Sequence, residues 1–115
     1  GLAWPSSVDS IPTSAGQEDH VSMGMTSANN LLRVLDNVEG ALACELLGAM
    51  AATDLRRPLQ SGPGTRAAHE IARERIPAWS NDRSPAPDIA AARELIRSHR
   101  LVEAAEAAIG HRLTG

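Results

Sequence analysis

Apolar residues recur every three or four positions through the first half of the chain. The series extends from position 21 to position 49, with Glu39 as its one polar member: Val21, Met25, Ala28, Leu32, Leu35, Leu42, Leu46 and Ala49. This spacing is that of one face of an α-helix. A neighbouring series, made of Leu31, Val34, Val38 and Ala41, widens the apolar sector beyond a two-stranded coiled-coil stripe. The pattern predicts a long bundle helix over residues 15–54.

The second half of this predicted helix is apolar on nearly all sides. Between Gly40 and Ala52 the only charged side chain is Glu45. Such a helix has to be buried all round or span a membrane. Eight uncharged residues separate Glu45 from Asp54, whereas a bilayer requires about 20. We therefore expect no membrane span. Because the rest of the chain is too short to surround the helix, we infer that other protein covers it.

Shorter helices are expected after a break at Pro58 and Gly62. Apolar spacing places them at residues 65–76, 88–98 and 101–109. Residues 1–16, before the long helix, are predicted to form a loop. Thr65 and Asp88 stand where side chains cap the first turn of a helix, and Gly110 stands where the last helix would end. No alternating strand pattern is present. The sequence predicts a single all-α segment.

Composition narrows the possible partners. The 115 residues carry a net charge of -3, and their basic side chains are all arginines. A chain with this charge has no basic surface of the kind that binds nucleic acid, so no nucleic-acid partner is expected.

The four histidines lack metal-ligand spacing, so no metal site is expected. The single cysteine, Cys44, lies in an apolar run and is predicted to be a small core residue. Residues 1–20 lack a secretory pattern, which predicts a cytoplasmic protein.

The densest polar cluster lies where the opening loop enters the long helix, and consists of Gln17, Glu18, Asp19 and His20. Acidic residues in a first helical turn complement the positive end of the helix dipole, which is one explanation for the cluster. The other is chemical. Side chains within one turn point in different directions, so a partner surface would have to complete a site. Burial there would raise the pKa of Glu18 into the range of a general base.

Several stretches of the chain resemble the histidine ammonia-lyases. The first and longest is SVDSIPTSAGQEDHVSMG at positions 7–24. It is followed by GALACELL at 40–47, Asp54-Leu55-Arg56, Asp82-Arg83 and APDI at 86–89. The resemblance covers nearly the whole chain. It implies the C-terminal portion of a mainly helical ammonia-lyase fold, in which long helices form the central bundle of a homotetramer.

The resemblance also implies an activity. Members deaminate L-histidine non-oxidatively to urocanate and ammonia, using a methylidene-imidazolone group that forms from an internal Ala-Ser-Gly. Glu18 matches the family's substrate-facing glutamate, which makes it the expected catalytic and substrate-binding residue. Gln17 beside it is a second expected substrate contact. A carboxylate can pair with the imidazole of the substrate.

Two parts of the family's machinery are missing from this sequence. It contains no Ala-Ser-Gly and no tyrosine, so the chain cannot form the prosthetic group or supply the family's tyrosine base. We expect it to be inactive alone. It would then be a fragment of a lyase chain, or a separate chain that works with an N-terminal lyase chain. Alternatively, it is a non-catalytic helical assembly module, or part of an aromatic amino acid ammonia-lyase or aminomutase. Glu18 argues against the last alternative, because those enzymes usually carry Asn-Gln-Asp at this position.

Overall fold

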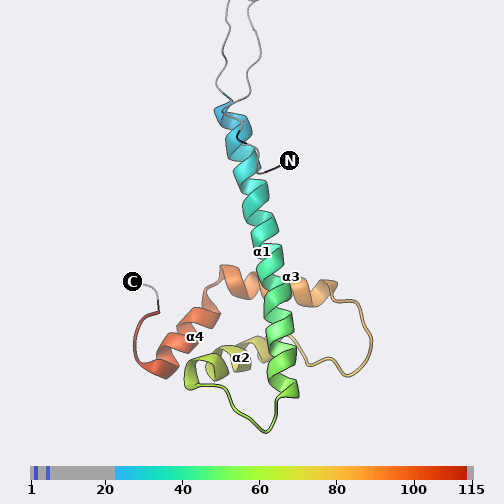
Figure 1. Ribbon diagram of the computed structural model, residues 1–115, viewed down its shortest axis with the longest axis vertical. Helices are drawn as coiled ribbons and strands as arrows, with labels where there is room; N and C mark the ends of the chain where they lie inside the picture. Colours follow the sequence, from blue (N-terminus) through green and yellow to red (C-terminus); the bar gives the residue numbers. More distant parts are fainter. Residues whose placement is uncertain (1, 3–4, 6–22, 114–115) are drawn as a thin grey trace, which may run out of the picture. The chain divides into compact units, whose positions relative to one another are not determined.

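The computed structural model describes residues 2, 5 and 23–113, and its regular structure is helical throughout this part of the chain. Figure 1 shows the helices in order: α1 (Gly24–Leu55), α2 (Pro63–Arg75), α3 (Ala86–Arg97) and α4 (Arg100–Ile109). The all-α fold class predicted from the sequence is confirmed. The predicted start of the long helix near residue 15 lies outside the described residues, and Met23 directly precedes α1.

The starts of two helices differ from the sequence prediction because prolines, and not side-chain caps, begin them. Helix α2 begins at Pro63, with Gly62 as its N-cap and no capping side chain, so the capping role predicted for Thr65 is wrong. Helix α3 follows Pro85, which is its N-cap. Asp88 lies inside the first turn of α3 and was wrongly predicted to cap it. A proline fits the first turn because it has no N–H to satisfy and its φ is already helical.

The chain divides into two compact units, residues 1–38 and residues 39–115. The core of the second unit is formed by side chains from three helices. Its buried members are Ala43 and Met50 from α1, Ala72 from α2, Ile76 directly after α2, and Ala92 and Leu95 from α3. Three of the six are alanines, whose small side chains allow helix backbones to approach closely. Leu46, Leu47, Ile71 and Ile89 pack around this core.

Helices α2 and α4 lie side by side in the second unit (Figure 1). A Cβ atom at Gly64 would lie 3.1 Å from Ile109 Cγ2 and 3.5 Å from the carbonyl oxygen of Ala105. The glycine therefore allows the first turn of α2 to approach α4 closely. Helix α4 ends at Gly110, whose φ of 75° is in the left-handed region that glycine adopts without strain.

The second half of α1 is covered on one side. Ala43 and Met50 are buried, whereas Leu42, Cys44 and Gly48 are exposed. The prediction that Cys44 is a core residue is wrong, because its side chain is exposed and is not among the residues of the core. One-sided cover agrees with the expectation that the short helices are too few to surround α1. Over the described residues, no helix combines the length and apolar character that crossing a membrane requires.

Candidate functional site

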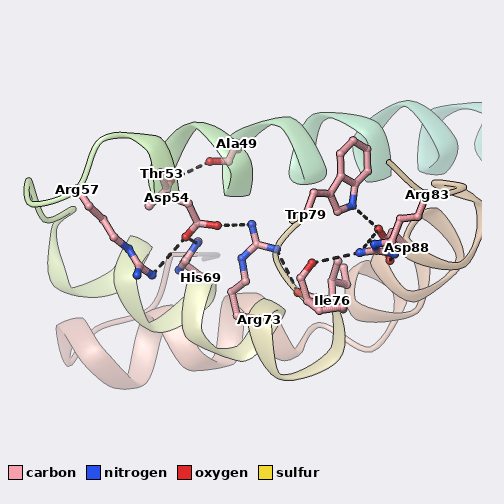
Figure 2. A network of polar contacts seen from close by, with 11 residues as sticks. Ala49, Thr53, Asp54, Arg57, His69, Arg73, Ile76, Trp79, Arg83 and Asp88 are labelled. Atoms are coloured by element: carbon pink, nitrogen blue, oxygen red, sulfur yellow. Dashed lines mark hydrogen bonds and ion pairs between the residues drawn. The ribbon is translucent and has the colours of Figure 1, made fainter. Parts of the chain in front are cut away.

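The two residues predicted to bind substrate, Glu18 and Gln17, lie outside the described residues. Their role therefore stays a prediction. The polar groups that the structure does describe form two linked clusters in the second unit, one around Asp54 and one around Asp88. Figure 2 shows both clusters.

Asp54, in the last turn of α1, is the centre of the first cluster. Its Oδ2 accepts a hydrogen bond of 2.6 Å from Arg73 Nη2 of α2. Its Oδ1 lies 3.2 Å from His69 Nε2 and 3.4 Å from Arg57 Nη2. The histidine contact is not aligned as a hydrogen bond, since the buried Nε2 has no hydrogen-bond partner. The cluster thus ties the end of α1 to α2 mainly through Arg73 (Figure 2).

Arg73 also connects Asp54 to the chain beyond α2. Its Nη1 donates a 3.1 Å hydrogen bond to the carbonyl oxygen of Ile76. The next carbonyl, that of Pro77, accepts a 3.2 Å hydrogen bond from Arg83 Nη2. Two arginines therefore hold adjacent carbonyls where the chain leaves α2, and they fix the start of the connection to α3.

Asp88 is the centre of the second cluster and is only 4% exposed. Its Oδ2 accepts a 2.6 Å hydrogen bond from Trp79 Nε1, and its Oδ1 accepts a 2.8 Å hydrogen bond from Arg83 Nη1. The hydrogen bond from Arg83 lowers the pKa of Asp88, aided by the bond from Trp79 and opposed by burial. The carboxylate thus stays ionised, and it holds a tryptophan and an arginine of the α2–α3 connection against α3.

A separate group of charged side chains joins α1 to α3 within the same unit. Arg97 Nε donates a 2.8 Å hydrogen bond to Glu39 Oε2, and Arg93 Nη2 lies 3.6 Å from the same oxygen. The hydrogen bond from Arg97 lowers the pKa of Glu39. This pairing accounts for the one polar residue in the apolar series of α1.

These contacts indicate structural roles. A general base needs a lone pair directed at substrate, whereas the carboxylates of Asp54, Asp88 and Glu39 are all engaged by arginines. The arginines that contact Asp54 are Arg57 and Arg73. Within residues 23–113, the cysteine, histidine and acidic side chains form no group that could hold a metal ion.

The structural role of Asp88 was not predicted from the sequence, although the position of Asp88 in the helical repeat of α3 indicates it. Asp88 stands four residues before Ala92 and seven before Leu95, and both of these are buried core residues. Helical spacing therefore places Asp88 on the inner face of α3. The partners Trp79 and Arg83 come from the α2–α3 connection, where no periodic pattern indicates contacts.

Comparison with known proteins now identifies the family. The aromatic amino acid lyase family model matches residues 1–74. The chain belongs to this family. It is 53% identical over 109 residues to the histidine ammonia-lyase of Natranaerobius thermophilus and 50% identical over 109 residues to that of Sorangium cellulosum. Each match covers 95% of this chain, yet the chain spans only 22% and 21% of the two relatives.

A solved structure supports the same fold. The crystal structure of histidine ammonia-lyase from Trypanosoma cruzi superposes with a TM-score of 0.84 at 40% sequence identity. The match covers 92% of this chain and 21% of that one. The arrangement of helices described above is therefore that of a segment of the ammonia-lyase fold, which confirms the resemblance seen in the sequence. Asp54, Arg83 and Asp88 belong to stretches that carry this resemblance, and all three hold the polar clusters together.

Proposed function

We propose that this chain is the C-terminal portion of a histidine ammonia-lyase-like enzyme, which deaminates L-histidine non-oxidatively to urocanate and ammonia. The observation that carries the proposal is the identity of about half, over 95% of the chain, to proteins named histidine ammonia-lyase. The whole enzyme would be homotetrameric, as the family resemblance implies, and we propose that it is cytoplasmic.

Within this proposal, Glu18 faces the substrate and its carboxylate pairs with the imidazole. A charge-assisted hydrogen bond to the ring would orient it, and the same carboxylate could accept or return a proton. Gln17 is a second contact to the substrate. A phenyl ring offers no hydrogen-bonding group to a carboxylate, so the glutamate favours L-histidine over a substrate with a phenyl side chain.

The electrophile of the complete enzyme would come from another part of it. The sequence has no Ala-Ser-Gly from which a methylidene-imidazolone group could form. In residues 23–113, the carboxylates of Asp54 and Asp88 are already held by arginines. Neither carboxylate is therefore free to contact the group. In the whole enzyme the group would supply the electrophile, and a tyrosine base would come from outside this chain as well.

Complementation tests the proposal. The Natranaerobius thermophilus histidine ammonia-lyase, with the segment that matches this chain deleted, is co-expressed with the chain and given L-histidine. We expect urocanate absorbance from the pair and none from either part alone. Glu18→Ala should remove most of this activity, whereas Glu94→Ala, a matched change at an exposed position of α3, should retain it.

Three results would contradict the proposal. Turnover that is unaffected by Glu18→Ala would reject the assigned role of Glu18. Stable association of the two chains without turnover would favour the alternative of a non-catalytic assembly module. The absent Ala-Ser-Gly and tyrosine are the observations that keep this alternative in view. Faster deamination of L-phenylalanine than of L-histidine would instead indicate an aromatic amino acid lyase.

A further inference from the structure

A cavity of about 480 Å³ lies between the α1–α2 connection and α2. Its lining residues are Thr53 of α1, residues 57–61 of the connection, and Arg66, His69 and Glu70 of α2. All of them lie within the second unit. The reaction proposed above uses none of these residues, so the cavity is a separate feature of the molecule.

The wall of this cavity is positively charged, although the chain as a whole has a net charge of -3. Arg57 and Arg66 line it together with one carboxylate, that of Glu70. In the described part of the chain, the two arginines have other partners. Arg57 Nη2 lies 3.4 Å from Asp54 Oδ1 (Figure 2), and Arg66 Nη1 donates a 3.0 Å hydrogen bond to Gln60 Oε1.

Neither partner neutralises its arginine. Asp54 already pairs with Arg73 at 2.6 Å, so its single charge is shared, and the Arg57 side chain is 75% exposed. The amide of Gln60 carries no charge. A guanidinium has five N–H donors in a planar fork, which matches two oxygens of a carboxylate or phosphate. Both arginines therefore keep donors that an oxyanion can use.

The remaining wall adds a polar group and an apolar surface. His69 Nε2 is buried and has no hydrogen-bond partner among the described residues. An unpartnered buried nitrogen costs free energy that a bound acceptor beside it can recover. Pro58 and Leu59 supply carbon atoms, and Leu59 is 68% exposed. The volume lies within the range of about 300–1,000 Å³ that is typical of sites for small organic molecules.

We propose that this cavity binds a small organic oxyanion. Arg57 and Arg66 hold its carboxylate or phosphate group, and its apolar part lies against Pro58 and Leu59. The site is independent of the proposed function, because it is formed by residues 53–70 and requires no deamination. Loss of the proposed function would therefore leave the site in place.

Titration of the full 115-residue chain with three anions tests the proposal. Phenyl phosphate and phenylacetate each carry an acidic group and an apolar ring, whereas inorganic phosphate has no apolar part. Binding is followed by the backbone amide NMR signals of Ser61 and Arg66 at constant ionic strength, because salt screens charge. We expect saturable shifts with at least one of the organic anions, and the tighter of the two identifies the preferred acidic group. Inorganic phosphate should bind at least about fivefold more weakly than the tighter organic anion.

Three substitutions separate a charged site from general attraction to the chain. Arg66→Gln removes a proposed ligand-binding charge and should weaken binding of the tighter organic anion at least about fivefold. Glu70→Gln removes the carboxylate of the same wall and should tighten binding about twofold. Arg75→Gln is the matched control, because Arg75 is exposed on the same helix but outside the cavity. It should change binding by less than about twofold.

Arg57→Gln is a second test in case Arg66→Gln disturbs the connection through the loss of its bond to Gln60. It should weaken binding in the same direction, and circular dichroism of each variant checks that the helices remain. The absence of saturable shifts with both organic anions would overturn the proposal. Equal weakening by Arg66→Gln and Arg75→Gln, or weaker binding after Glu70→Gln, would do so as well. Inorganic phosphate that binds as tightly as the organic anions would reject an organic ligand.

Discussion

The two halves of α1 have the same apolar spacing but very different surroundings. In the first half, Leu31, Leu32 and Leu35 are each more than half exposed. In the second half, Ala43 and Met50 are buried among side chains from α2, α3 and Ile76. A helical period identifies an apolar face, but it does not say which part of a protein covers that face. In this chain the covering residues for the second half follow it in sequence, and those for the first half are not within the described residues.

Polar contacts follow the same division. Glu39, the first residue of the second unit, pairs with Arg97 and Arg93 of α3. Fifteen residues further on, in the last turn of α1, Asp54 pairs with Arg73 of α2. The second half of α1 is therefore fixed at both ends by arginines from neighbouring helices. These pairs hold α1 against the core. Substitutions in the second half of α1 should therefore lower the free energy of unfolding more than substitutions in the first half.

The largest expected difference comes from shortening one apolar side chain in each half. Met50 is 2% exposed in the core, so Met50→Ala leaves a cavity and should lower the free energy of unfolding by about 3 kcal/mol. Leu32 is 64% exposed, so Leu32→Ala should change it by about 0.5 kcal/mol or less. Urea denaturation of the isolated chain at low concentration measures both. Equal losses would show that the first half is packed in solution.

The next effect in size concerns the buried carboxylate. Asp88→Ala leaves Trp79 Nε1 and Arg83 Nη1 without the carboxylate that accepts from them, and we expect a loss of about 2 kcal/mol in the free energy of unfolding. Asp88→Asn is the control of equal size, because its amide oxygen can still accept from Trp79 while the charge is lost. Asp88→Asn should lower the free energy of unfolding by less than Asp88→Ala does. If both variants are as stable as the parent chain, the second cluster does not hold the α2–α3 connection.

A smaller effect is expected from acid. The pKa of Asp88 in the folded chain is below its ordinary value of 3.8, because Arg83 and Trp79 bond the ionised form. The contribution of Asp88 to the free energy of unfolding is therefore fully present above pH 3.8. It is lost as the pH falls through the lower pKa that Asp88 has in the folded chain. The denaturation midpoint should therefore decrease as the pH is lowered from about 5 to about 2, the range in which carboxylates titrate. Asp88→Asn should reduce this dependence, and an unchanged acid profile would argue against the pairing.

The smallest effect is expected at the boundary between the two units. Glu39→Gln removes the charge that Arg97 and Arg93 share, but the pair is partly exposed, so water and salt already weaken it. We expect a slight loss of stability at low ionic strength that disappears in concentrated salt. Thermal unfolding of the parent chain and the variant at two salt concentrations makes the comparison. A loss that salt leaves unchanged would indicate packing by the Glu39 side chain instead of charge.

Sequence patterns predicted the helices better than their ends. Four stretches with a helical period correspond to α1 to α4, because burial of one face of each helix leaves a repeat in the sequence. The ends depend on local backbone chemistry. Pro63 begins α2 two residues before the predicted start, since proline is favoured in the first turn. Where the chain has no repeat, as around Trp79 and Arg83, the sequence contained no indication of contacts.

The candidate site was predicted through family resemblance and one local pattern. The Gln17-Glu18-Asp19 stretch supports an expectation about substrate that periodicity could not supply, and it lies outside the described residues. The exposure of Cys44 was missed because an apolar run looks the same whether it faces a core or an open surface. Cys44 was accordingly expected in the core, and the structure places it at an exposed position.

Hydrogen exchange tests most directly the claim that the second unit is stabilised by its own core while the first half of α1 depends on protein outside the described residues. The isolated chain is measured as a dilute monomer, and then with the segment-deleted Natranaerobius thermophilus lyase. We predict slow exchange around Met50, Ala72 and Leu95 in both states, and fast exchange at residues 24–38 that slows in the complex. Protection of residues 24–38 equal to that of the core in the monomer, or no gain in the complex, would contradict this account.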